Sequence, residues 1–205
     1  MAKTADEFTD ALDRNAAAFG LELSGDSLQR LTDYYHLVTK WNTRLHLVAP
    51  CSPGEFAVRH VLESLMLLKY LPVSASVADV GTGAGLPIIP CLLVRDDLRA
   101  TLFESSERKS IFLKEALRSV TPPARTQLVV SRFEDVSSPR TNFITCRALD
   151  RFSEKLPELI EWALPGTAFA FFAGEALRQQ ILSLLPSAEV ERIPKSESRF
   201  LLIAS

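Results

Sequence analysis

Three glycines in one short segment can place the backbone directly against a ligand. Gly81, Gly83 and Gly85 follow the β-prone run Ala75–Val80. Because glycine has no side chain, such a loop can bend tightly and approach a bound molecule where a strand turns into a helix. Glu104 closes the next β-prone run about twenty residues later, where a carboxylate can accept hydrogen bonds from both hydroxyls of a ribose. The pattern favours a nucleoside-containing ligand over the plainer alternative, a tight turn followed by a solvated glutamate.

The spacing of the glycines separates two classes of nucleoside cofactor. A dinucleotide-binding loop needs the pattern G-x-G-x-x-G, and Leu86 stands where its third glycine would fall. S-adenosylmethionine (SAM) contains no pyrophosphate, so its loop need only let backbone groups pass along the methionine and ribose parts. The sequence therefore favours SAM as the cofactor. A nucleotide-dependent oxidoreductase on the same type of fold is the weaker alternative.

A third loop carries groups that suit an adenine. Ser131-Arg132-Phe133-Glu134-Asp135 follows another β-prone run. Phe133 can present an aromatic edge to the base, and Glu134 can present a carboxylate. The alternative is that Phe133 belongs to the core and that the two acidic residues begin a helix.

The order of the predicted elements must bring these loops together. Strands are predicted at Ala75–Val80, Thr101–Phe103, Gln127–Val130, Asn142–Cys146, Thr167–Ala173, Glu189–Ile193 and Arg199–Ala204. Helices are predicted at Leu86–Val94, after Ser105 or Ser106, at Phe152–Ala163 and at Glu175–Leu185. The inner face of the second helix is expected to comprise Ile111, Phe112, Leu113, Ala116, Leu117 and Val120. This alternation predicts an α/β fold with a mainly parallel seven-stranded sheet and helices on both faces. Ligands of such sheets bind at the carboxyl ends of the strands, where the three loops lie.

The first 72 residues are predicted to be helical. From Leu28 to Val48 apolar residues recur every three or four positions, which is typical of one long amphipathic helix, and the preceding Ser24–Ser27 segment offers a cap. Ser52-Pro53-Gly54-Glu55 then supplies a capping hydroxyl, a proline at the first helical position and a carboxylate in the first turn. That helix is expected to run from Pro53 to Leu71, because Pro72 cannot continue the ladder. We therefore expect a helical extension over residues 1–72 and a compact core over residues 73–205.

Length and composition exclude several classes of protein. A chain of 205 residues and 22.7 kDa fits one domain with an appendage. A composition of 47% hydrophobic and 23% charged residues excludes a disordered or collagen-like chain. No stretch approaches the roughly 18 uncharged apolar residues of a membrane span, and the first residues lack the apolar segment of a signal peptide. We expect a cytoplasmic protein without a membrane partner.

The cysteines and histidines predict neither disulfides nor a metal. Cys51, Cys91 and Cys146 are odd in number, lie far apart and form no C-x-x-C pattern. His36, His46 and His60 show no spacing typical of metal ligands. We assign no metal.

The formal net charge of −2 hides an asymmetry along the chain. Residues 1–33 carry seven acidic and three basic side chains, a balance of −4, so the remainder carries +2. A strong nucleic-acid footprint would be far more basic. Charge alone therefore does not decide what kind of partner the protein has.

An ordered set of short motifs resembles one known family. The motifs are Trp41-Asn42, Arg59-His60-Val61-Leu62-Glu63-Ser64, Asp79-Val80-Gly81-Thr82-Gly83-Ala84-Gly85-Leu86-Pro87, Glu104-Ser105, Lys109, Phe112-Leu113, Ser131-Arg132-Phe133-Glu134 and Arg147-Ala148. In this order and spacing the chain from about Leu28 to Leu164 resembles the bacterial small-subunit ribosomal RNA guanine-7-methyltransferases, also called glucose-inhibited division protein B.

The resemblance implies a Rossmann-like SAM-dependent methyltransferase with an N-terminal helical extension. It further implies methylation of one guanine in the small subunit's RNA, free or in the assembled subunit, by a protein that we expect to be monomeric. Carried over position by position, the family's cofactor contacts fall on Gly81, Leu86, Phe133, Glu134 and Arg147. With the residues singled out by spacing, the predicted cofactor site also includes Gly83, Gly85 and Glu104.

Two positions depart from the family pattern. Where the family has Pro-Gly-Ile-Pro after the glycine loop, this chain reads Leu86-Pro87-Ile88-Ile89-Pro90, so an isoleucine replaces a glycine. Where the fifth core strand of the family commonly ends in Lys-Gly, this chain has Ala173-Gly174. These changes leave open an alternative, a SAM-binding protein of the same family with altered or lost catalysis.

The implied chemistry needs positioning rather than a catalytic base. Nitrogen 7 of guanine holds a free lone pair, so no proton must be removed before it attacks the methyl group, and alignment can supply about 7–11 kcal/mol. We therefore assign no catalytic side chain and name Arg147, then Arg132, as positioning candidates. Arg59, His60, Arg108 and Lys109 are candidates for RNA phosphates. A solvated helix face is an equal alternative for these four, and His60 fits a core histidine as well.

Overall fold

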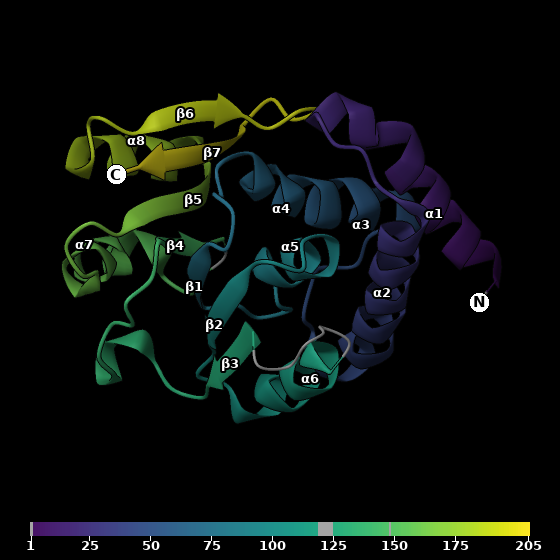
Figure 1. Ribbon diagram of the computed structural model, residues 1–205, viewed down its shortest axis with the longest axis horizontal. Coiled ribbons are helices and arrows are strands. Elements are labelled where there is room, and N and C mark those ends of the chain that lie inside the picture. The colour runs from purple at the N-terminus through teal and green to yellow at the C-terminus, as the bar shows by residue number, and fades with distance from the viewer. Residues whose placement is uncertain (1, 119–124, 148) are drawn as a thin grey trace.

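The computed structural model describes residues 2–118, 125–147 and 149–205 (Figure 1). They form one seven-stranded sheet in the order β3-β2-β1-β4-β5-β7-β6. The strands are β1 Ser76–Val80, β2 Arg99–Phe103, β3 Thr126–Val129, β4 Phe143–Cys146, β5 Ala168–Gly174, β6 Glu189–Arg192 and β7 Arg199–Ala204. β1 to β5 pair in parallel, whereas β7 is antiparallel to both β5 and β6. The predicted mainly parallel sheet is confirmed.

Helices cover both faces of this sheet (Figure 1). The helices of the core are α5 Ile88–Val94, α6 Glu107–Leu117, α7 Phe152–Trp162 and α8 Glu175–Leu184. Side chains alternate across a strand, so Val77 and Phe172 enter a hydrophobic cluster with α5 and α6. Ala78 and Phe171, one position away from each, enter a second cluster with α7 and α8. The sheet thus separates two hydrophobic layers.

The N-terminal helices join the first of these layers. They are α1 Ala2–Ala16, α2 Gly25–Leu45, α3 Pro53–Phe56 and α4 Glu63–Leu65, with short 3₁₀ turns at Ala17–Phe19 and Met66–Lys69. The rings of Phe8 in α1 and Tyr35 in α2 stack with centroids 4.4 Å apart. The Tyr34 hydroxyl donates to the carbonyl of Ala84 at 2.6 Å, within the glycine loop. Residues of the extension therefore pack into the same cluster as α5 and α6 and reach the predicted ligand loop.

Serine side chains begin three helices as predicted. Ser24 Oγ accepts from the Ser27 N–H, Ser52 Oγ from the Glu55 N–H and Ser106 Oγ from the Lys109 N–H, at 3.2, 3.1 and 3.3 Å. Each bond satisfies a backbone donor that the first helical turn leaves without a partner. The capping signals were thus read correctly from local sequence.

The helix predicted from Pro53 to Leu71 is not uniform. Ala57–Leu62 form a π-helical turn between α3 and α4. Such turns are rare and often lie at functional sites. This one carries Arg59 and His60, which the sequence analysis named as RNA candidates.

Three other expectations need revision. The helix predicted to reach Val48 ends at Leu45, because the Asn42 side chain holds the Val48 N–H and carbonyl at 2.9 and 3.1 Å and so fixes the chain in a loop. Ile111, expected on the inner face of α6, is 56% exposed, since its neighbours Phe112 and Leu113 occupy the buried side. Val120 and Ala148, named above, lie outside the described residues.

Candidate functional site

The glycine loop follows β1 and adopts a backbone that other residues rarely adopt. Gly81, Gly83 and Gly85 have φ angles of +69°, +57° and +83°. A Cβ atom on Gly81 would lie 2.7 Å from Leu149 Cδ1, and one on Gly85 would lie 2.3 Å from Ile89 Cδ1. A Cβ atom on Gly83 would meet nothing nearer than 3.8 Å. Gly81 and Gly85 are therefore required by packing, while Gly83 faces open space.

Glu104 lies at the end of β2 and touches this loop. Its Oε2 accepts from the Gly83 N–H at 3.0 Å, and its Oε1 accepts from the Ser106 N–H at 2.8 Å. The side chain is fixed by backbone donors and the residue is only 6% exposed. Each carboxylate oxygen still has a further lone pair, so the group can accept hydrogen bonds from a diol as predicted.

These two elements form part of the wall of a cavity of about 470 Å³. The cavity is lined by Leu47, Val48, Ala49, His60, Gly81, Thr82, Gly83, Ala84, Leu86, Glu104, Ser105, Ser106, Lys109, Arg147, Leu149 and Asp150. Its size lies in the range typical of small-molecule sites. The structure thus brings most of the predicted cofactor residues together, and it adds the 47–49 loop, which the sequence analysis had placed in a helix.

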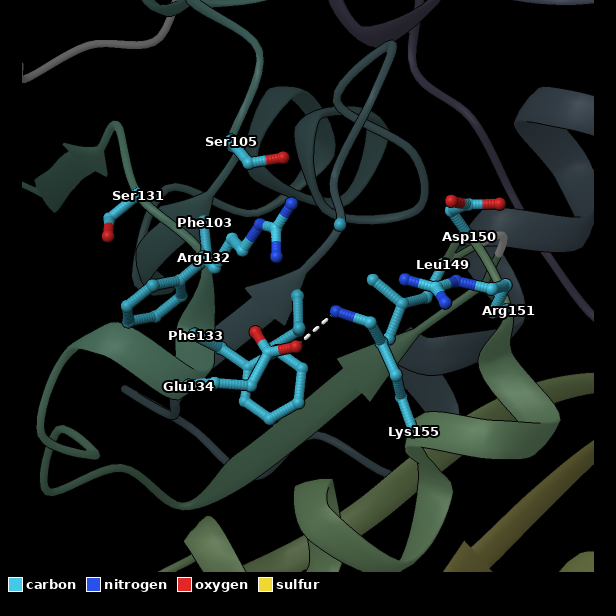
Figure 2. A pocket seen from close by; sticks show the side chains of 12 residues that line it. Phe103, Ser105, Ser131, Arg132, Phe133, Glu134, Leu149, Asp150, Arg151 and Lys155 are labelled. Carbon is cyan, nitrogen blue, oxygen red and sulfur yellow. Dashed lines mark hydrogen bonds and ion pairs between the residues drawn. The ribbon is translucent and has the colours of Figure 1, made fainter.

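A smaller hollow of about 100 Å³ adjoins the cavity and shares Gly81, Ser105, Leu149 and Asp150 with it (Figure 2). Phe133 and Glu134 line the smaller hollow together with Arg132. Lys155 Nζ of α7 pairs with Glu134 Oε1. Although burial opposes it, the hydrogen bond from Lys155 lowers the pKa of Glu134. Lys155 was not singled out in the sequence, because nothing local connects it with residue 134.

The structure confirms the plainer alternative for the third loop, while the adenine contact stays a prediction. Phe133 is buried and packs edge-on against Trp162, with ring centroids 5.5 Å apart, so it belongs to the core. Phe133–Asp135 also form a short 3₁₀ turn. Glu134 nevertheless faces the smaller hollow, and its Oε2 is buried without a partner among the described residues. A ligand donor could therefore satisfy it.

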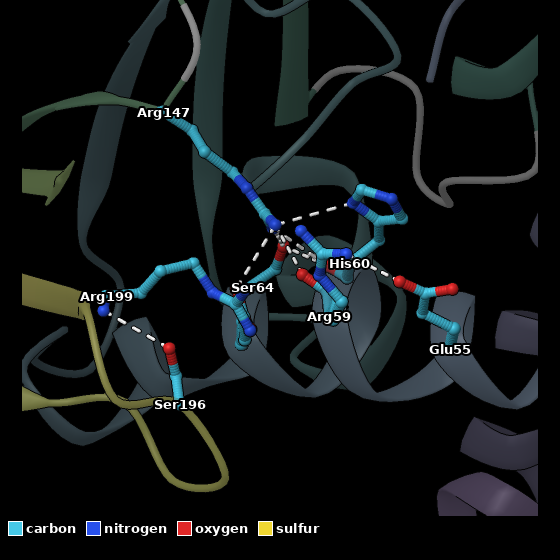
Figure 3. A network of polar contacts seen from close by, with 8 residues as sticks. Glu55, Arg59, His60, Ser64, Arg147, Ser196 and Arg199 are labelled. Atoms are coloured by element: carbon cyan, nitrogen blue, oxygen red, sulfur yellow. Dashed lines mark hydrogen bonds and ion pairs between the residues drawn. The ribbon is translucent and has the colours of Figure 1, made fainter. Parts of the chain in front are cut away.

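Arg147, at the end of β4, is held by a dense set of acceptors (Figure 3). Its guanidinium donates to the carbonyls of Arg59 and His60, to Ser64 Oγ and to Glu63 Oε2. These four acceptors, and His60 Nδ1 at 3.4 Å from Nη2, all belong to the helix that carries the π turn. Glu63 is itself buried and also pairs with Arg199 of β7. Arg147 therefore lines the cavity while connecting three parts of the fold.

The other predicted basic residues lie in different settings. Lys109 and His60 line the cavity. Arg59 is exposed and pairs with Glu55 at 2.5 Å, and exposed Arg108 donates to the carbonyl of Arg44 at 3.3 Å. Neither of these arginines lines the cavity. The four RNA candidates thus divide into two at the cavity wall and two on the surface.

Asp79 of β1 is buried next to the glycine loop and lines neither the cavity nor the smaller hollow. Its Oδ2 accepts from the Thr82 hydroxyl at 2.5 Å, whereas its Oδ1 has no partner among the described residues. Burial raises the pKa of Asp79 to about 8, against the effect of the Thr82 hydrogen bond. An acidic residue at the end of an otherwise apolar buried strand was the available signal of this buried acid.

The two departures from the family pattern do not reach the cavity. Ile88 is fully buried in the first hydrophobic layer at the start of α5, and it lines neither the cavity nor the smaller hollow. Ala173 is buried in the second layer. The isoleucine is therefore accommodated by the core.

Comparison with known proteins assigns the family. A sequence profile described as GidB, rRNA small subunit methyltransferase G, matches residues 27–201. The chain belongs to this family. A ribosomal RNA small subunit methyltransferase G from Xanthomonas campestris pv. campestris (strain B100) is 35% identical over 173 residues, which cover 82% of this chain and 81% of the relative. One from Neisseria meningitidis serogroup C (strain 053442) is 31% identical over 193 residues, covering 92% and 86%.

Solved structures support the fold of this rRNA small subunit methyltransferase G family member. A SAM-dependent methyltransferase from Aquifex aeolicus superposes with a TM-score of 0.55 at 18% identity, covering 75% of this chain and 93% of that one. The ribosomal protein L11 methylase of Lactobacillus delbrueckii subsp. bulgaricus gives a TM-score of 0.55 at 13% identity, covering 72% and 78%. The Rossmann-like methyltransferase fold is confirmed, and the protein is a SAM-dependent methyltransferase.

The residues present fit SAM. The open side of Gly83 leaves room for a ligand beside the loop, and the Glu104 carboxylate has lone pairs for ribose hydroxyls. Glu134 Oε2, at the smaller hollow, lacks a partner among the described residues, and the adenine amino group is a donor of the required kind. Within the described residues no group of three or more histidine, cysteine or acidic side chains could hold a metal ion, and no helix is long and apolar enough to cross a membrane.

Proposed function

We propose that this protein transfers the methyl group of SAM to nitrogen 7 of a guanine in small-subunit ribosomal RNA. The observation that carries the proposal is the contact between Glu104 and the Gly83 N–H at the wall of the main cavity. This hydrogen bond connects the glycine loop to the acid at the end of β2, the two sequence features from which SAM binding was predicted. Family membership supports ribosomal RNA as the substrate class.

The cofactor residues have distinct roles in this proposal. Gly81, Gly83 and Leu86 supply the backbone and apolar surface at the cavity, and Glu104 accepts from the ribose hydroxyls. Gly85 does not line the cavity, and its role is to let the loop turn against Ile89. Phe133 and Glu134 border the adenine in the smaller hollow. Arg147 holds the cavity wall in place, since its terminal nitrogens are engaged by protein acceptors.

The chemistry asks the protein for alignment. Bound SAM supplies an electrophilic methyl group, and the guanine lone pair needs no base to expose it. The cavity residues therefore act by fixing the approach of the base and by excluding water.

Basic residues around the cavity supply the RNA contacts that we propose. Lys109 lines the wall on the α6 side and can meet a phosphate next to the target nucleotide. Arg108, on the adjacent exposed surface, and Arg59, on the π turn, extend this cationic border. Arg132, which lines the smaller hollow, is a weaker positioning candidate. A guanine in a folded RNA would have to leave its stack to enter the cavity.

The proposal also covers the oligomeric state, the cellular location and the domain organisation of the protein. We infer that the protein acts as a monomer in the cytoplasm, where bacterial ribosomal subunits are assembled. Residues 1–72 serve as a helical extension of the methyltransferase core over residues 73–205. Their shared hydrophobic layer and the Tyr34–Ala84 hydrogen bond support a single working unit.

The test measures transfer of a labelled methyl group and then maps the methylated position in the RNA. Labelled SAM is incubated with small subunits, and separately with their naked RNA, from cells that lack this protein. Transfer to N7 of one guanine is expected, and the responding substrate distinguishes the assembled subunit from free RNA. Label in small molecules or lipids, or no RNA label with either substrate, would contradict the proposal. SAM binding without transfer would instead favour the alternative of lost catalysis, which Ile88 and Ala173 first suggested.

A further inference from the structure

We propose that His60 recognises O6 of the target guanine through the proton on its Nε2 atom. The inference rests on the proposed function and deepens it, because it names the group that selects the base. His60 was predicted above as a candidate for an RNA phosphate, and the geometry points to a different partner.

The position of His60 leaves it available to the base. The wall of the main cavity comes from three sources: the loops and helix start that follow β1 and β2, the segment after β4 with Arg147, Leu149 and Asp150, and the N-terminal segment that contributes Leu47–Ala49 and His60. The Gly83 and Glu104 side of the cavity is the part that fits SAM. The N-terminal side therefore remains for the second substrate, and His60 is the titratable side chain that this segment places there.

Contacts fix which ring nitrogen carries the proton. Arg147 Nη2 lies 3.4 Å from His60 Nδ1 (Figure 3). A guanidinium has donors only, so Nδ1 must accept and the proton resides on Nε2. The Phe56 ring, 5.0 Å away between centroids, restrains the imidazole. The backbone is restrained too, since the His60 carbonyl accepts from both Arg147 and Ser64.

The imidazole is held neutral. Burial, and then the positive charges of Arg147, Arg59 and Arg199, lower the pKa of His60 to about 3. At neutral pH the ring therefore offers no charge to a phosphate. It offers one oriented N–H group.

A neutral donor suits guanine as it is methylated. The N7 acceptor of guanine is flanked by the O6 acceptor, whereas adenine has an amino group at position 6. A donor at this place therefore favours guanine over adenine. In the transfer, the N7 lone pair bonds to the methyl carbon, the carbon–sulfur bond breaks with its electrons left on sulfur, and no proton moves. The purine gains positive charge, which an uncharged donor does not oppose.

The experiment pairs a protein variant with a base analogue. Small subunits are reconstituted with RNA that carries guanine or 2-aminopurine at the mapped target, because 2-aminopurine keeps N7 and lacks O6. Single-turnover methylation is measured for the wild type and His60→Ala. Removing either O6 or the imidazole is expected to slow transfer about 10- to 100-fold, and removing both is expected to cost no more than removing one. Independent, multiplying losses would overturn the proposal.

Two further variants distinguish recognition of the base by His60 from a purely structural role of its side chain. His60→Gln can place an amide N–H near the position of Nε2, and His60→Asn can place one near Nδ1. Partial recovery of guanine methylation by the glutamine variant alone is expected, and recovery by neither or by both would contradict the proposal. Calorimetry should give unchanged SAM affinity for all variants. If His60→Ala does not fold, the Gln and Asn pair decides the question. Failure of wild-type protein to methylate guanine would instead refute the proposed function.

Discussion

Two arginines connect the N-terminal helical segment to the sheet, one at each edge of the strands. Arg147 lies at the carboxyl edge, and Arg95 follows α5 at the amino edge. Each donates to two consecutive carbonyls of that segment, Arg147 to Arg59 and His60 and Arg95 to Leu71 and Pro72. Each is also paired with a carboxylate, Glu63 for Arg147 and Asp97 for Arg95. At both edges a guanidinium group therefore binds two backbone carbonyls of the N-terminal segment and one carboxylate.

The two connections differ in depth and in what lies beside them. The side chain of Glu63 is 2% exposed, whereas that of Asp97 is 32% exposed. Arg147 lines the main cavity, and Arg95 lines none of the hollows described here. Disturbing the first connection should therefore affect both the fold and the site, while disturbing the second should affect the fold alone.

Size does not distinguish the two edges. A hollow of about 690 Å³ lies at the amino edge, lined by residues 140–142, 164–167 and Ser76, and it exceeds the main cavity. One left-handed glycine, Gly166, lines it, but it has neither three such glycines in one loop nor any carboxylate among its lining residues. Converging backbone and acid groups, rather than volume, indicate the ligand site.

The largest expected difference between the edges is in stability. Glu63→Gln removes the buried counter-charge that partly buried Arg147 and Arg199 share, so we expect it to lower the free energy of unfolding by about 3 kcal/mol. Asp97→Asn removes a more exposed partner of Arg95 and should lower it by about 1 kcal/mol or less. Urea denaturation of both variants measures this difference. Equal losses would show that burial of the pair at the carboxyl edge has no energetic weight.

The next effect separates ligand binding from backbone strain. Gly83→Val would place a branched side chain at a positive φ and into the open side of the loop, and we expect SAM affinity to fall by more than about 100-fold, or about 2.7 kcal/mol. Gly20 has φ +69° with nothing near its Cβ position and lies outside the cavity. Gly20→Val should therefore carry a similar backbone strain and retain SAM binding. Calorimetry decides, and weakened binding in both variants would show that strain alone is responsible.

A smaller effect is expected from conservative changes of the arginines themselves. Arg147→Lys replaces a planar fork by one point charge that cannot hold both carbonyls. We expect SAM affinity to fall about tenfold, since the cavity wall shifts. Arg95→Lys should leave SAM affinity unchanged, because Arg95 is remote from the cavity. Unchanged affinity for Arg147→Lys would confine that residue to a structural role.

The contrast also explains what the sequence could predict. Gly81, Gly83, Gly85 and Glu104 were identified because each signal is local, a loop after a strand or an acid at a strand end. Serine caps and strand order followed for the same reason. These features need no knowledge of distant contacts.

Features that depend on long-range pairing escaped the sequence analysis. Glu63 interrupts an apolar run, which is a signal of a buried charge, but its partners lie more than eighty residues away. The π turn at Ala57–Leu62 has no local sequence signal that we can identify. Lys155 could be linked to Glu134 only once α7 was placed beside the third loop.

The smallest expected difference is in pH dependence, and it isolates His60. Its pKa is about 3 in the folded protein against 6.5 ordinarily, so between these values the unfolded chain binds more protons and stability falls as pH falls. From pH 7 to 6 we expect the wild type to lose about 0.7 kcal/mol through this group, and His60→Gln to lack that loss. Asp79, whose raised pKa acts in the opposite direction, is present in both proteins, so its effect cancels in their difference.

The control lies at the amino edge. There the hydrogen bond from Arg95 lowers the pKa of Asp97, so the contribution of Asp97 to stability is lost only below about pH 4. Asp97→Asn should therefore leave the slope between pH 5 and 7 unchanged, and a slope that survives in His60→Gln would place the titrating group elsewhere.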